Sequence, residues 1–130
     1  MRAGEVYKGE PGDIARARRL AGELFDRLRS AGRPAPGAVV ANVQLVVSEL
    51  VTNAVKYAEG PCGVGLQVVG DTVEVSVWDT SQGPVAEMGP DPGRVGRHGL
   101  EIVRMICGGF DVADTPTGKR ITARIPLLLP

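Results

Sequence analysis

The chain has 130 residues, of which 43% are hydrophobic and 4% aromatic, so it can bury one aliphatic core. Its 15 basic and 15 acidic residues give a formal net charge of zero. This balance disfavours a protein that binds nucleic acid mainly through phosphate contacts, because such proteins normally carry a basic excess. We therefore expect one domain over residues 1–130, with no direct nucleic-acid partner.

The cysteines and the terminal sequences narrow the class further. Cys62 and Cys107 are isolated in the sequence, which is typical of reduced thiols in a cytoplasmic protein. A zinc site needs about four ligands, and the single histidine, His98, cannot complete such a set. The N-terminus lacks a signal-peptide pattern, and we expect no apolar run near the ~20 residues that span a bilayer. No membrane contact is expected.

The first elements in chain order are a strand and a helix. A short strand is predicted around Val6, and a turn follows over residues 9–12. Asp13 is predicted as the N-cap of a helix that ends before Gly32 and the prolines beyond it. The apolar residues that recur at helical spacing are Ile14, Ala17, Ala21, Leu24 and Leu28.

A second helix is predicted over residues 38–58, followed by a hairpin. The apolar face of this helix includes Val43, Val47, Leu50 and Ala54. Ala58 is also expected to lie in the core. Alternating valines predict strands around residues 64–68 and 73–77, and the Gly-Asp pair at 70–71 is typical of a hairpin turn.

The last third of the chain contains a long loop. Residues 80–98 hold four glycines and three prolines, which predicts irregular structure. A short helix is predicted over residues 100–106, and a last hairpin over residues 110–115 and 120–125. This order favours an α+β fold, a two-layer α/β sandwich whose mixed, mostly antiparallel sheet carries about three helices on one face.

The second predicted helix carries a polar stripe. Glu49, Asn53 and Lys56 lie at i, i+4 and i+7, so at about 100° per residue they share one narrow face. Asn42 lies on the same stripe two turns earlier. The spacing alone also fits an ordinary solvated face, so the neighbouring motifs must separate the two interpretations.

The run from Glu49 to Tyr57, ELVTNAVKY, resembles the N-box of the gyrase, heat-shock-ATPase and histidine-kinase superfamily. Within that superfamily, residues 38–125 are most similar to the stand-alone anti-sigma-factor serine/threonine kinases of bacteria. The resemblance implies a Bergerat-type ATP-binding fold, in one histidine-kinase-like ATPase domain over residues 1–130. It also implies ATP and Mg²⁺ as cofactors.

The resemblance gives each polar residue of this helix a role. Asn53 would bind Mg²⁺ through its side-chain oxygen, a hard ligand that suits the ion. Glu49 would be the general base, and it would accept the proton of a target hydroxyl in a kinase or orient water in an ATPase. Lys56 would reach the phosphates. Tyr57 would lie along the adenine or ribose, although a boundary position in the core explains it equally well.

A second motif lies at the end of the strand over residues 73–77. Asp79 in WDTSQG matches the superfamily aspartate that accepts a hydrogen bond from the adenine amino group. Ser81 replaces the first glycine of the usual Asp-x-Gly-x-Gly pattern, which also points to the anti-sigma branch. Gly83 is the remaining glycine of this turn that would approach the nucleotide. Near the C-terminus, Thr122 is expected to help close the adenine pocket, although its preference for β-strands explains it nearly as well.

Residues 95–103 resemble the second glycine box, which opens the next helix. Glycines let the backbone approach phosphate closely, and a helix N-terminus presents free N–H groups to it. Arg97 would pair with a phosphate or with an acidic group of a partner. His98 enlarges the gap between the glycines relative to the usual Gly-Arg-Gly-Leu. The cofactor-binding residues implied here are Gly96, Arg97, Gly99 and Leu100.

These motifs predict a protein serine/threonine kinase. By resemblance, it would phosphorylate an anti-sigma-factor antagonist, hold a sigma factor when the antagonist is phosphorylated, and so regulate transcription. The alternative is a nucleotide-dependent protein-binding module without kinase activity. The family often forms homodimers, so a dimer is compatible with both. A histidine-kinase fragment is disfavoured, because His98 lies in the loop and no helical dimerisation segment bears a phospho-acceptor.

Overall fold

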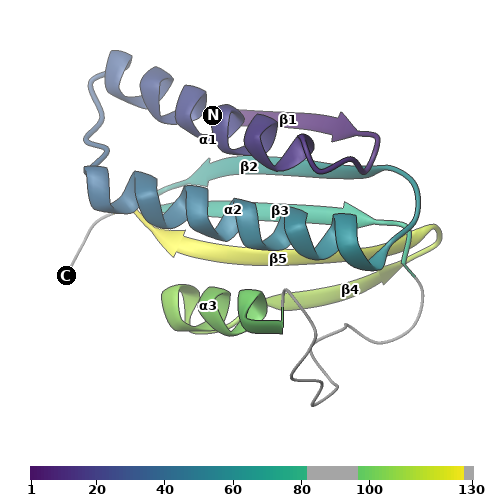
Figure 1. The fold of residues 1–130 in the computed structure, drawn as a ribbon. Helices are drawn as coiled ribbons and strands as arrows, with labels where there is room; N and C mark the ends of the chain where they lie inside the picture. The colour runs from purple at the N-terminus through teal and green to yellow at the C-terminus, as the bar shows by residue number, and fades with distance from the viewer. Residues whose placement is uncertain (82–96, 128–130) are drawn as a thin grey trace.

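The computed structural model describes residues 1–81 and 97–127 (Figure 1). The elements in chain order are β1 (Arg2–Tyr7), α1 (Asp13–Ser30), α2 (Gly37–Tyr57), β2 (Cys62–Val69), β3 (Thr72–Asp79), α3 (Arg97–Cys107), β4 (Asp111–Thr115) and β5 (Gly118–Pro126). Their number, type and order agree with the sequence-based prediction, and the α+β sandwich is confirmed.

The described strands form one five-stranded sheet in the order β1-β2-β3-β5-β4. All of its pairings are antiparallel, so the sheet is more regular than the mixed sheet that the sequence suggested. The predicted hairpin between β2 and β3 is present, with Val69 opposite Thr72. Gly70 in its two-residue turn has a φ of +59°, a conformation that glycine adopts without strain.

The helices lie on one face of the sheet (Figure 1). α2 is central, because it packs on β2, β3 and β5 and also contacts α1 and α3. Along β3 the valines at 73, 75 and 77 are buried, while the residues between them are half-exposed. This alternation fixes the faces: odd-numbered residues of β3 point toward the helices, and even-numbered residues toward the open face.

The predicted apolar faces of α1 and α2 are largely buried, as expected. In α1, every residue of the predicted apolar face is buried except Ile14, which is half-buried. In α2, Leu50 and Ala54 are buried, and so are Val46 and Val51 on either side of the predicted stripe. The buried surface is broad because α2 is covered on several sides. Ala58 was expected in the core but lies just beyond the helix and is half-buried.

Asp13 is not the N-cap of α1, which corrects the sequence-based prediction. Gly12 occupies that position, without a side-chain capping bond. The Asp13 carboxylate is completely buried and accepts hydrogen bonds from the backbone N–H groups of Gly9 and Glu10, at 2.9 and 2.7 Å. Its other oxygen pairs with Arg16 at 2.7 Å. The carboxylate therefore faces back into the β1–α1 loop and holds that loop closed.

The apolar length of α2 also differs from expectation. Residues 37–56 are long and apolar enough to cross a membrane by length and composition, whereas the sequence analysis expected no such run. Half of this segment is buried inside the protein, where it packs against the sheet and the other helices. Core helices of globular proteins share these properties, so the segment is weak evidence for a membrane span.

Candidate functional site

The three polar residues of the α2 stripe differ in how far they are exposed to solvent. Asn53 is only 8% exposed, Glu49 is half-buried and Lys56 is exposed. Within the described residues, neither the Asn53 carboxamide nor the Glu49 carboxylate has a hydrogen-bond or ion-pair partner. Because Asn53 is more than nine-tenths buried, the stripe is not simply a solvated face at this position. The three side chains lie on the helical face that the sequence predicted.

Asp79 ends β3 on the helix-covered side of the sheet and is 7% exposed. Its Oδ1 atom accepts hydrogen bonds from the Ser81 backbone N–H at 2.8 Å and from the Ser81 hydroxyl at 2.5 Å. This local turn fixes the carboxylate and shows what Ser81 does in place of a glycine. Oδ2 has no partner among the described residues, so one acceptor of this buried group remains available.

The end of β3 is packed tightly against its neighbours. The hydroxyl of Thr80 donates a hydrogen bond to the carbonyl of Glu59, which joins this strand to the loop after α2. A Cβ atom on Gly118 would lie 1.9 Å from the Asp79 carbonyl oxygen. Only a glycine lets β5 begin this close to Asp79, so two separate contacts constrain the backbone at the end of β3.

Lys119 is a residue of this region that the sequence analysis missed. It is the direct β5 partner of Asp79, lies on the same face of the sheet and is 8% exposed. Its Nζ atom lies 2.6 Å from Oδ1 of Asp114, its partner on β4. The predicted last hairpin could have pointed to Lys119, because it places this residue at the start of a strand. A single sequence does not, however, define the register between β3 and β5.

Thr122 is not brought to Asp79. The strands alternate, so Thr122 lies on the open face of the sheet, where its hydroxyl is 3.2 Å from that of Ser76 on β3. Asp79 points to the opposite, helix-covered face. The expected role of Thr122 in closing an adenine pocket is therefore not compatible with this register, and Lys119 occupies the corresponding position beside Asp79.

α3 begins at Arg97, three residues before the predicted start, so Arg97, His98 and Gly99 belong to its first turn. Leu100 is 2% exposed and packs in the hydrophobic core, which leaves only its backbone for contact with a ligand. Gly83 and Gly96 lie outside the described residues. The side chains of Tyr57 and Arg97 are also outside that description.

Cys62 links the Asp79 region electrostatically to the N-terminal loop. Burial raises the pKa of its thiol to about 11, and the charges of Asp13 and Asp79 act in the same direction. Both carboxylates therefore lie near one buried thiol, which stays protonated at neutral pH. Burial likewise raises the pKa of Cys107 to about 11. Neither cysteine has the character of a reactive nucleophile.

The donor set near Asn53 is compatible with Mg²⁺. No group of three or more His, Cys, Asp or Glu side chains suited to a metal occurs in the part of the chain that the structure describes. A metal held by protein alone is thus not indicated there. Mg²⁺ in nucleotide sites needs only one or two protein oxygens and takes the rest from water and phosphate, which Asn53 and Glu49 fit.

The fold and these groups can be compared with known proteins. The family model described as the histidine kinase-like ATPase domain matches residues 9–125. The chain belongs to this family. The match begins after β1 and covers all three helices and nearly all of β2 to β5, so it includes the α2 stripe and Asp79. Family membership makes ATP the expected ligand, and a kinase or ATPase activity the expected class of reaction. No curated protein sequence matches the chain directly.

Solved structures share the fold of this histidine kinase-like domain. The RsbU and RsbW domains of Rv1364c from Mycobacterium tuberculosis match all of this chain, with a TM-score of 0.67 and 19% identity. The histidine kinase domain of the blue-light activated kinase from Erythrobacter litoralis EL346 matches 88% of it, with a TM-score of 0.52 and 25% identity. The Acinetobacter baumannii histidine kinase AdeS matches 97%, with a TM-score of 0.56 and 15% identity.

These matches differ in how much of the other protein they cover. The chain spans 33% of the Rv1364c structure, 60% of the Erythrobacter domain and 68% of the AdeS structure. The likenesses at 19% and 15% identity are therefore evidence for the fold, and the activities of those longer proteins do not transfer with it.

Proposed function

We propose that this ATPase-family domain is an anti-sigma-factor serine/threonine kinase. It would transfer the γ-phosphate of ATP to a serine or threonine of an anti-sigma-factor antagonist and so control sigma-factor-dependent transcription. The support for this role is the resemblance of residues 38–125 to that branch, together with the fold shared with a structure that contains an RsbW domain. A cytoplasmic location, expected from the isolated cysteines, is part of the same proposal.

One observation carries the ATP-binding part of the proposal. Asn53 and Asp79 are both more than nine-tenths buried, on two elements that pack together, α2 and β3. The last turns of α2 and the end of β3 lie at the same end of the sandwich (Figure 1). Each side chain also keeps a polar atom without a described partner. An adenine amino group and a phosphate-bound cation are ligands that would satisfy Asp79 and Asn53 respectively.

The other residues then have the roles that phosphoryl transfer requires. Glu49 would accept the proton of the attacking serine or threonine hydroxyl as its oxygen bonds to the γ-phosphorus and ADP leaves. Lys56 would compensate phosphate charge from one turn further along α2. Mg²⁺, when bound with Asn53, would supply further neutralisation of that charge. Backbone amides of the glycine box would complete the phosphate contacts, at Gly96, Arg97, Gly99 and Leu100. Gly83, in the turn after Asp79, would approach the nucleotide.

Catalysis in this scheme depends on position and charge rather than on covalent chemistry. Phosphoryl transfer needs an aligned hydroxyl and stabilisation of the phosphate oxygens, both of which a fixed site can provide. Tyr57 would lie along the adenine or ribose from the end of α2. Lys119 replaces Thr122 in our proposal as the β5 residue beside Asp79, because only Lys119 is on the correct face.

A nucleotide-dependent binding module without phosphotransfer remains the second candidate. The features that favour it are His98, which enlarges the glycine box, and Ser81, whose side chain occupies Oδ1 of Asp79. In that case ATP binding would only alter contact with a sigma factor or an antagonist. Either protein could act as a homodimer.

Two measurements on the full chain test these proposals in order. Calorimetry with ATP and Mg²⁺ tests nucleotide binding, and absence of binding would reject both candidates. Transfer of radiolabelled phosphate to candidate antagonists, captured from the native cell with the chain as bait, then separates a kinase from a binding module. ATP binding with no transfer to any captured protein would favour the module.

A further inference from the structure

The Tyr7 hydroxyl is buried without a hydrogen-bond partner. It is the single such side-chain atom among the residues that the structure describes. Tyr7 is the last residue of β1, lies on the helix-covered face and is 6% exposed. Leaving a hydroxyl buried and unpaired costs on the order of 1–3 kcal/mol, so the absence of a partner calls for an explanation.

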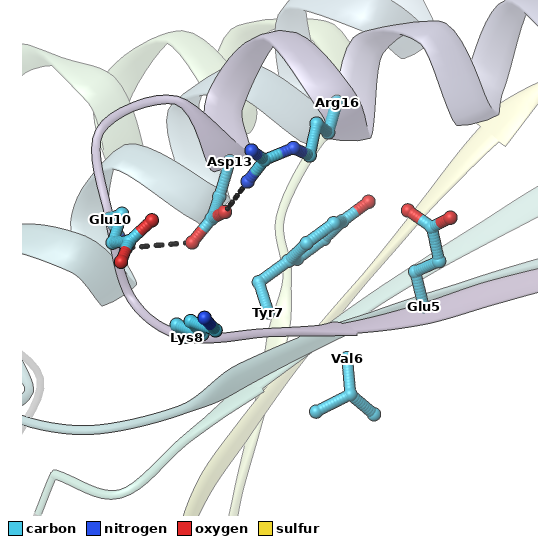
Figure 2. Close-up of a pocket in the computed structure, with 7 residues that line it drawn as sticks. All are labelled: Glu5, Val6, Tyr7, Lys8, Glu10, Asp13 and Arg16. Atoms are coloured by element: carbon cyan, nitrogen blue, oxygen red, sulfur yellow. Dashed lines mark hydrogen bonds and ion pairs between the residues drawn. The ribbon is translucent and has the colours of Figure 1, made fainter.

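A hollow of about 360 Å³ lies beside this hydroxyl, between β1, the β1–α1 loop and the start of α1 (Figure 2). Glu5 and Tyr7 are two residues apart on β1 and point to the same side, toward α1. The Tyr7 ring lies below Arg16, and its hydroxyl is directed toward the Glu5 carboxylate. Val6 points to the other side of the strand.

The hollow continues along α1. A second hollow of about 310 Å³ shares Glu5 and Arg16 with the first and extends to Arg19 and Glu23. β1 is an edge strand of the described sheet, so this side of it has no neighbouring strand. The two hollows share two residues and form one groove, whose volumes of about 360 and 310 Å³ are larger than a small ion fills.

The charged side chains near the Tyr7 hydroxyl differ in whether they have an ion-pair partner. Arg16 is neutralised by Asp13, whose oxygens are fully used by Arg16 and by the amides of Gly9 and Glu10. Glu5 is exposed and forms no ion pair with any described residue. Lys8 also lines the hollow, and Figure 2 draws it on the loop side of the Tyr7 ring, opposite the hydroxyl. The unpaired charge next to Tyr7 is therefore negative.

The ionisation of Tyr7 agrees with this geometry. Burial raises the pKa of its hydroxyl far above the ordinary value, and the neighbouring Glu5 carboxylate raises it further. Asp13 and Cys62 add smaller effects of the same sign. The hydroxyl is thus protonated at physiological pH, in surroundings that favour an incoming positive charge. It can donate to Glu5 and still accept a hydrogen bond on its oxygen.

We propose that the groove between β1 and α1 binds an arginine side chain presented by a partner protein, with guanidinium N–H groups donating to the Glu5 carboxylate and the Tyr7 oxygen. A guanidinium group is planar and carries five donors, so it can satisfy both acceptors at once. Glu5 is the movable wall of the hollow, because it is exposed while Tyr7 is fixed in the core. The residues that line this site differ from the proposed nucleotide residues, so the proposal does not rest on ATP binding.

The test uses two peptides and the isotope-labelled full chain. The peptides are acetyl-Gly-Arg-Gly-amide and its citrulline analogue, which has nearly the same shape but no charge. Nuclear magnetic resonance titration is expected to show shifts of the amides of residues 5–16 with the arginine peptide, at a dissociation constant of about 1–10 mM. The citrulline peptide is expected to bind about tenfold more weakly, because the charge-assisted hydrogen bonds are lost.

Variants assign the binding to the two acceptors. Glu5→Gln is expected to weaken arginine-peptide binding about tenfold. Asp71→Asn removes the same charge at the far end of the β2–β3 hairpin and is expected to leave binding unchanged. Tyr7→Phe is expected to weaken binding, because the guanidinium group loses the hydroxyl oxygen as an acceptor.

Three results would overturn the proposal. The first is equal shifts with the arginine and citrulline peptides, or no shifts with either. The second is unchanged arginine binding in Glu5→Gln. The third is free arginine binding as tightly as the peptide, which would replace a protein partner with a small molecule. If Tyr7→Phe instead unfolds the chain, the comparison of Glu5→Gln with Asp71→Asn still decides.

Discussion

Asp79 and Lys119 are paired across β3 and β5, and both are more than nine-tenths buried on the helix-covered side of the sheet. Lys119 also binds Asp114 at 2.6 Å, so opposite charges alternate across three neighbouring strands. Lys119 therefore brings a positive charge to the strand beside the buried Asp79 carboxylate, which also receives two hydrogen bonds from Ser81. A buried charge that keeps compensating neighbours is far less costly than an isolated one.

Asp79→Asn is expected to weaken ATP binding by about tenfold or more, because the adenine amino group would lose a charged acceptor. The fold should survive, since the amide oxygen of asparagine can still accept the Ser81 N–H. Calorimetry with ATP and Mg²⁺ measures the effect. Asp71→Asn, which makes the same change in the β2–β3 turn, is the control. Equal affinities for the wild type and Asp79→Asn would remove Asp79 from the adenine site.

Glu49→Ala is expected to abolish detectable phosphotransfer, because its rate should fall about 10²–10⁴-fold, while ATP affinity changes little. Glu49 is half-buried and has no ion pair among the described residues, so the substitution breaks no contact that the structure shows. The assay is radiolabelled transfer to the antagonist, paired with calorimetry on the same preparation. Glu59→Ala is a control at an exposed glutamate beyond α2. Transfer at the wild-type rate would exclude Glu49 as the base.

Asn53→Ala is expected to remove the dependence of ATP affinity on Mg²⁺. The wild type should bind ATP more tightly with Mg²⁺ than with excess chelator, whereas the variant should bind with similar, weaker affinity in both. Titrating ATP under the two conditions gives the comparison. Because the Asn53 carboxamide has no described hydrogen bond, the melting temperature should fall little. A full Mg²⁺ response in the variant would place the ion elsewhere.

The parts of the fold that depend on local pattern could be predicted from the sequence. Alternating valines marked β3, and helical spacing marked the buried face of α1, because each pattern follows from the geometry of one element. The Gly70-Asp71 turn was predictable for the same reason. The stripe of Glu49, Asn53 and Lys56 needed only the existence of α2. None of these predictions required knowledge of a distant contact.

The errors concern relations between elements. Asp13 was assigned to its own helix, but the loop before it supplies amide donors that the sequence does not reveal. Thr122 was expected to help close the adenine pocket, but the register of β5 against β3 turns it to the open face and brings Lys119 beside Asp79 instead. A shift of one residue reverses every side chain of a strand, so such a site cannot be assembled from motifs alone.

Gly118→Ala is expected to lower both stability and ATP affinity. The new methyl group would lie 1.9 Å from the Asp79 carbonyl oxygen, so β5 must move away from the end of β3. Overpacking of this kind typically costs about 1–3 kcal/mol. Gly65→Ala on β2 is the matched control, because its Cβ would meet no atom within 4 Å. Urea unfolding and calorimetry measure the two effects, and equal behaviour of the two variants would contradict the close approach.

Cys62 is expected to make the stability of the fold fall as the pH rises from about 9 to about 11. Its thiol has a pKa near 9.0 when unfolded and about 11 when folded, because burial disfavours the thiolate. The folded state therefore holds the proton more tightly, and this contribution is complete below pH 9 and lost as the pH passes 11. Its size is at most about 2–3 kcal/mol.

Urea unfolding between pH 8 and pH 11 tests this effect. The parent protein for this comparison is Cys107→Ser, because the thiol of Cys107 has a similarly raised pKa and would titrate in the same pH range. Adding Cys62→Ala should lower stability at all pH values through lost packing, but should flatten the decline between pH 9 and pH 11. Tyr7 also loses its proton only at very high pH in the folded state, and its contribution is common to both proteins. Parallel declines in the two proteins would show that Cys62 is not the titrating group.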